Sequence, residues 1–109
     1  IITMCGTPQQ LMTELKTALL QLYGSRLHAL CLFGSYARGE ADAESDVDVL
    51  IVLDDFTRYG AEVDRTSELV ASLSLHYAVS ISTVFVRRAD WLHGDSPFLA
   101  NVRKEAIAA

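Results

Sequence analysis

Two aspartates separated by one residue stand at the start of an apolar segment. Asp46 and Asp48 are followed by residues 49–53, which carry no polar side chain. Because side chains on a strand alternate between faces, both carboxylates would point the same way, with Cα atoms about 6.5–7 Å apart. Carboxylates at that spacing can share one hard cation such as Mg²⁺, which binds oxygen ligands at about 2.1 Å. We therefore predict that Asp46 and Asp48 are metal ligands and catalytic residues.

A Gly-Ser pair ends the preceding apolar segment. Ten residues separate Ser35 from Asp46. A glycine at position 34 lets a phosphate approach the backbone closely. If Ser35 opens a short helix, its N–H and hydroxyl face an anion that the helix dipole also favours. Arg38 lies one turn further on and can pair with phosphate oxygens in bidentate fashion. Gly34, Ser35 and Arg38 are thus candidate phosphate-binding residues that face the metal.

Each of these residues also has a purely structural interpretation. The two aspartates could form a solvated strand end, and Arg38 could be a surface arginine in a tight turn. Ser45 fits either a nucleotide-binding residue or a turn residue that orients Asp46. The acidic residues of loop 40–45 fit a solvated loop, and because they would repel an anionic ligand they could face a partner instead. Because the Gly-Ser pair would place phosphate donors opposite the two aspartates, we favour a shared phosphate and metal site over these structural interpretations.

Hydrophobic periodicity indicates which elements position these residues. Thr7 and Gln10 are typical of a capping box, and apolar residues then repeat at helical spacing as far as Gly24. We expect strands over 26–33, 46–53 and about 79–86, a helix over about 63–77, and a last helix from Pro97 that continues through 106–109. This order predicts an α/β (α+β) two-layer fold, with helices packed on a small mixed β-sheet.

Composition restricts the class of protein. The 109 residues fit one domain, 1–109. A formal net charge of -5 without a basic run argues against broad nucleic-acid or anionic-membrane binding, and the apolar stretches are too short to span a membrane. Cys5 and Cys31 lack metal-ligand spacing, which fits a reducing cytoplasm. The first residue is Ile and the end lies in a helical pattern, so we expect further residues at both ends.

The segment GSYARGEADAESDVDVLIVL resembles the nucleotidyltransferase superfamily that includes DNA polymerase β. Within it, the chain is most similar to the minimal nucleotidyltransferases of HEPN toxin–antitoxin pairs. The resemblance implies that Gly34 and Ser35 bind the β- and γ-phosphates of ATP, and that Asp46 and Asp48 hold one Mg²⁺ or a two-metal site. It further implies an antitoxin that transfers AMP to a hydroxyl, a tyrosine of a HEPN-type toxin, and that assembles into homo- or hetero-oligomers.

The sequence departs from that family at one position. Family members commonly carry a third carboxylate on a later strand, where the register predicts Ser82, with Ser80 on the same face. A missing acid weakens the metal beside the attacking hydroxyl more than the metal beside the nucleotide. We therefore predict retained Mg-ATP binding with transfer that is reduced or depends on an acid of the partner. The alternative is a degenerate module that neutralises its partner by binding. Glu105, which many family members match, is interpreted as a structural or interface residue.

Overall fold

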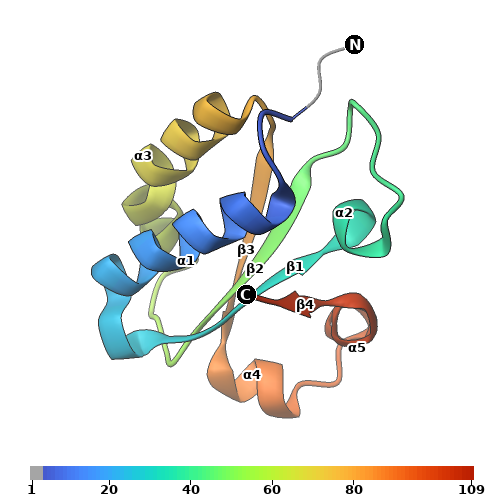
Figure 1. Cartoon of the computed structure of the whole chain (residues 1–109). Helices are drawn as coiled ribbons and strands as arrows, with labels where there is room; N and C mark the ends of the chain where they lie inside the picture. The colour runs from blue at the N-terminus through green and yellow to red at the C-terminus, as the bar shows by residue number, and fades with distance from the viewer. Residues whose placement is uncertain (1–3) are drawn as a thin grey trace.

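The computed structural model describes residues 4–109, so residues 1–3 of the predicted domain lie outside it (Figure 1). Five α-helices, one short 3-10 turn and four strands follow one another along these residues. In chain order they are α1 (Pro8–Tyr23), η1 (Gly24–Arg26), β1 (Leu27–Phe33), α2 (Gly34–Arg38), β2 (Val47–Leu53), α3 (Tyr59–Tyr77), β3 (Ile81–Arg87), α4 (Arg88–His93), α5 (Pro97–Glu105) and β4 (Ile107–Ala108).

The strands form one mixed sheet in the order β3-β2-β1-β4, as the predicted fold class requires. β1 runs antiparallel to β2 and to β4, while β2 runs parallel to β3. The end of β1 and the beginnings of β2 and β3 therefore lie at the same edge of the sheet. This topology brings the Gly-Ser pair, the Asp-x-Asp pair and Ser82 of β3 to the same end of the sheet.

The two faces of the sheet have different coverings. Val49 and Ile51 of β2 belong to the larger core, which packs against α1 and α3. Leu50 and Val52 belong to a smaller core that includes residues of α5. Because strand side chains alternate, Asp48 lies on the same face as Leu50 and Val52. The aspartate is thus predicted to face the side of the sheet whose core includes residues of α5. Figure 1 shows α1 and α3 together on the other side of the sheet.

The capping box predicted for the first helix is present. Thr7 Oγ1 accepts from Gln10 N at 3.1 Å, and Thr7 N donates to Gln10 Oε1 at 2.9 Å. Leu11, Leu15 and Leu19 are fully buried, and each contributes roughly 1.5–3 kcal/mol of burial free energy. The burial of these leucines holds α1 against the sheet, on the face opposite Asp48.

The last helix is shorter than predicted. α5 ends at Glu105, where Ala106 turns extended (φ -64, ψ 138). Ile107 and Ala108 then form β4 beside Leu32 and Cys31 of β1. Small apolar residues fit a helix or a strand equally well. Pairing with the free edge of β1 gives the backbone groups of these residues hydrogen-bond partners that exist only in the folded sheet. The predicted continuation of the helix through 106–109 is therefore wrong.

Smaller differences concern the boundaries of other elements. α3 begins at Tyr59, before the first periodic residue used to predict it, β2 begins one residue after Asp46, and β3 covers Ile81–Arg87. Helix and strand ends are less determined by periodicity than their interiors are. In residues 4–109, no helix has both the length and the apolar character that a membrane crossing needs.

Candidate functional site

Four of the predicted site residues line one hollow where β1 ends: Gly34, Ser35, Arg38 and Asp48. Ser45 and Asp46 line a different hollow. Asp48 of β2 lies between two register partners, Phe33 of β1 and Ser82 of β3. Gly34 directly follows Phe33 and opens α2. The structure thereby brings Gly34, Ser82 and Asp48 together from three different elements, and it confirms the register that placed Ser82 beside the acidic pair.

Gly34 packs directly against one of the aspartates. Its φ is +73°, in the left-handed region, and its residue is buried. A Cβ built on Gly34 would overlap Oδ2 of Asp48. Glycine is therefore required here for its backbone conformation and for its lack of a side chain. This close approach fixes the Gly-Ser turn against the carboxylate of Asp48.

Substitution of Gly34 is expected to destabilise the protein. Gly34→Ala should cost roughly 1–3 kcal/mol, because the new Cβ meets Asp48 at a positive φ. Thermal unfolding measures this, since 1 kcal/mol shifts the midpoint by about 4–8 °C in a domain near this size. Gly60→Ala is the matched control, because an added Cβ meets nothing within 4 Å there. Equal midpoints for the two variants would contradict the close-approach argument.

The two aspartates differ in exposure. Asp46 is exposed just before β2, and Asp48 is partly buried. Burial raises the pKa of Asp48, the negative charge of Asp46 raises it further, and Glu105 adds a smaller effect, while Arg38 opposes them. A cation bound beside both carboxylates would offset the unfavourable charge of Asp48.

The carboxylate pair fits magnesium only together with a further ligand. Within residues 4–109, no group of three or more His, Cys, Asp or Glu side chains is placed to hold a metal. Mg²⁺ is commonly bound by one or two carboxylates plus substrate phosphates and water. Asp46 and Asp48 meet that description, and Ser82, which is exposed beside Asp48, adds no carboxylate.

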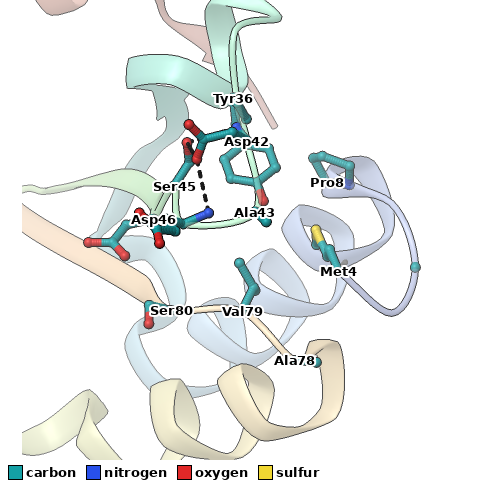
Figure 2. A pocket seen from close by; sticks show the side chains of 13 residues that line it. Met4, Pro8, Tyr36, Asp42, Ala43, Ser45, Asp46, Ala78, Val79 and Ser80 are labelled. Atoms are coloured by element: carbon teal, nitrogen blue, oxygen red, sulfur yellow. Dashed lines mark hydrogen bonds between the residues drawn. The ribbon is translucent and has the colours of Figure 1, made fainter. Parts of the chain in front are cut away.

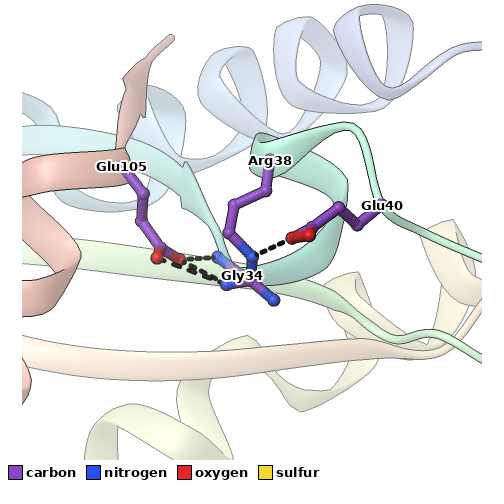
Figure 3. Close-up of polar contacts among 4 residues, drawn as sticks. All are labelled: Gly34, Arg38, Glu40 and Glu105. Atoms are coloured by element: carbon purple, nitrogen blue, oxygen red, sulfur yellow. Dashed lines mark hydrogen bonds and ion pairs between the residues drawn. The ribbon is translucent and has the colours of Figure 1, made fainter.

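Arg38 is held by two carboxylates (Figure 3). Its Nε donates to Glu40 Oε1 at 2.6 Å, and its Nη1 donates to Glu105 Oε2 and Oε1 at 3.1 and 3.2 Å. Glu105 Oε2 also accepts from Gly34 N at 2.5 Å. Sequence reasoning placed Glu105 in a structural or interface role and missed this contact. Gly34 and Glu105 are separated by 71 positions in the sequence, so no local pattern could have indicated this contact.

Ser45 takes part in the turn that precedes the acidic pair. Its Oγ accepts from Asp42 N at 2.9 Å and donates to Asp42 Oδ1 at 3.2 Å. These bonds match the alternative interpretation of Ser45 as a turn residue that orients Asp46. Its role in nucleotide binding stays a prediction.

Two hollows flank the acidic pair. One, of about 780 Å³, has Asp46 and Ser80 at one end and Tyr36, Pro8 and Met4 across from them (Figure 2). The other, of about 520 Å³, lies on the α5 side and is lined by Gly34, Ser35, Arg38, Asp48, Glu105 and neighbouring residues of α5. The second hollow collects backbone and guanidinium donors beside a carboxylate. An anion with a bound cation fits that chemistry.

The mixed sheet, with a Gly-Ser turn packed against Asp48, agrees with the resemblance of the sequence to nucleotidyltransferases. Residues 12–105 match the family model described as "Nucleotidyltransferase domain". The chain belongs to this family, and the resemblance seen in its sequence is confirmed.

Two proteins of Methanocaldococcus jannaschii, each named "Putative protein adenylyltransferase", are similar to the chain. One is 36% identical over 84 residues, which cover 72% of this chain and 78% of the relative. The other is 33% identical over 79 residues, which cover 72% and 79%. Nucleotidyltransferase activity is therefore the class of reaction to which the chain's relatives are assigned.

Two solved structures share the fold. A crystal structure of the toxin-antitoxin MntA-HpeT in a substituted form has a TM-score of 0.61 at 19% identity, covering 87% of this chain and 69% of that chain. A toxin-antitoxin structure with AMP-PNP has a TM-score of 0.59 at 22% identity, covering 85% and 68%. At these identities the likeness concerns the fold, and it confirms the predicted nucleotidyltransferase architecture.

Proposed function

We propose that this nucleotidyltransferase domain binds Mg-ATP and transfers AMP to a hydroxyl of a partner protein. The observation that carries the proposal is the packing of Gly34 against Asp48, which sets a phosphate-binding turn directly beside a metal-binding carboxylate. Neither the Gly-Ser turn nor the carboxylate would bind a triphosphate alone. The triphosphate needs hydrogen-bond donors for its oxygens and a cation to offset its charge.

Each site residue has a distinct role in this scheme. Gly34, Ser35 and Arg38 bind phosphate oxygens, and Asp46 and Asp48 hold magnesium. Magnesium bound there supplies positive charge to the triphosphate and to the departing pyrophosphate.

The reaction itself is a substitution at phosphorus. The acceptor oxygen attacks the α-phosphorus and forms a new P–O bond, while the bond to the β-phosphate oxygen breaks and pyrophosphate leaves. The hydroxyl proton passes to water or to a carboxylate of the partner, because Ser82 offers no base beside Asp48.

The partner in this proposal is a HEPN-type toxin, with a tyrosine as the acceptor, in the cytoplasm. Support comes from relatives named as protein adenylyltransferases and from fold neighbours that are toxin-antitoxin structures. The acidic loop 40–45, exposed except for Ser45, borders the larger hollow and offers the partner a charged surface. Together with a homo- or hetero-oligomeric assembly, this arrangement would present the acceptor hydroxyl to the nucleotide site.

A second candidate function is neutralisation of the toxin by contact alone. The observation that favours it is Ser82, a neutral side chain at the register position beside Asp48. Under this function the site binds nucleotide without efficient transfer.

Mass spectrometry of the partner separates the two functions. The partner to test is a small helical protein encoded beside this chain that carries an Arg-(four residues)-His motif. After incubation with the chain and Mg-ATP, added AMP on the partner supports transfer. A partner that is inhibited but unmodified would contradict transfer and favour contact.

A further inference from the structure

The carboxylate of Glu105 already occupies the anion-binding groups of the site. It accepts from Gly34 N at 2.5 Å and from Nη1 of Arg38 through both oxygens (Figure 3). The side chain of Glu105 is 23% exposed and that of Arg38 46% exposed, so the bond to Gly34 N is the more sheltered part of this contact. A residue from the end of α5 is thereby bound to the start of α2.

These donors are the same ones that the proposed function assigns to phosphate. A carboxylate oxygen and a phosphate oxygen are both anionic acceptors, and both are met by a backbone N–H or a guanidinium at similar distances. One N–H of Gly34 cannot donate fully to Glu105 and to a phosphate at once. Binding of a triphosphate in this place therefore competes with Glu105.

The charge balance around Arg38 strengthens the competition. Glu40 and Glu105 both pair with this one arginine, and the charge of Glu105 also contributes to the raised pKa of Asp48. The donors of the site are thus offset by carboxylates before any ligand arrives. Removing the charge of Glu105 would leave Arg38 and Gly34 more favourable to an incoming anion.

We propose that Glu105 is an affinity-setting residue of the nucleotide site, whose carboxylate holds the place of a phosphate group until a polyphosphate displaces it from Gly34 and Arg38. The inference rests on the proposed function, because it concerns the same phosphate-binding groups. In this role Glu105 does not bind the substrate; it competes with the substrate for the same hydrogen-bond donors.

Displacement of Glu105 would also affect α5 and β4, the two elements between which this residue lies. Glu105 is the last residue of α5, whose Leu99 and Val102 pack in the smaller core. Ala106 and β4 follow immediately, and Ile107 pairs with Leu32 at the edge of β1. A bound polyphosphate therefore acts on the end of α5 and on the short strand after it.

Calorimetric binding of Mg-ATP and of Mg-tripolyphosphate to wild type and to Glu105→Gln tests this role. Glutamine keeps the size and one acceptor oxygen but removes the charge, so both ligands are expected to bind about three- to tenfold tighter. Glu68→Gln, on an exposed position of α3, changes the net charge equally and should stay within about twofold of wild type. Wild-type binding with equal or weaker binding by Glu105→Gln overturns the inference and leaves the proposed function standing. Absence of binding by both proteins overturns the inference and the proposed function.

A second measurement avoids substitution altogether. The amide resonance of Gly34 should move when tripolyphosphate and magnesium are added to wild-type protein, because its acceptor changes from Glu105 to phosphate. A Gly34 resonance that stays in place while the ligand binds would contradict displacement.

Discussion

Asp48→Asn is expected to lower AMP transfer to the partner by at least about a hundredfold. Asparagine keeps the shape of the side chain, but it removes the negative charge that would hold magnesium under the proposed function. Transfer of labelled AMP, compared between wild type and the variant, measures the loss. Asp54→Asn is the matched control, because Asp54 is a half-exposed acid just beyond the opposite end of β2. Equal losses in both variants would contradict a specific role for Asp48.

The same substitution should have the opposite effect on the stability of the ligand-free protein. Burial, then the charge of Asp46, raises the pKa of Asp48. A carboxyl whose pKa is raised by folding binds its proton more tightly in the folded state, so folding is favoured as the pH falls toward that pKa and disfavoured where the group is ionised. Asparagine carries no charge, so the unfolding midpoint at neutral pH should rise by about 1–3 °C. A variant that both melts earlier and loses transfer would indicate a structural defect instead.

Local patterns in the sequence predicted the part of the site that lies along continuous strands. The register against β3 placed Ser82 next to Asp48, as the structure has it. Period-two alternation predicted a common direction for Asp46 and Asp48, and this stays a prediction because β2 begins only at Val47. The Gly-Ser turn followed from a glycine at the end of an apolar strand. These features depend on neighbours a few residues apart, which is the distance over which side-chain alternation and turn preferences act.

The contacts that the sequence did not predict join residues far apart in the chain. Glu105 reaches Gly34 and Arg38 only because α5 packs across the sheet face that carries Asp48. β4 forms only because β1 has a free edge beside it. The end of α5 and the hydrogen bonds of Glu105 to Gly34 and Arg38 have no local sequence signal, because both are consequences of tertiary packing.

Ser82→Asp is expected to raise AMP transfer by about a hundredfold if the missing third acid limits the reaction. Position 82 is the register partner of Asp48, on a neighbouring parallel strand about 4.8 Å away. An aspartate there adds a carboxylate on the same face, where it can accept the hydroxyl proton of the acceptor and offset further positive charge. The same labelled-AMP assay measures the gain.

The Ser82→Asp substitution should also lower stability, and this gives a second measurement of the added charge. A third carboxylate beside Asp46 and Asp48 increases the repulsion that already raises the pKa of Asp48, so Ser82→Asp should melt earlier than wild type without magnesium. Added magnesium should recover more stability in this variant than in wild type, because ligand binding to the folded state is linked to its stability. Ser82→Asn, of the same size and neutral, separates charge from shape. If transfer by Ser82→Asp does not exceed transfer by Ser82→Asn, the acid is supplied elsewhere, and robust transfer by wild type alone would show that the site is complete without it.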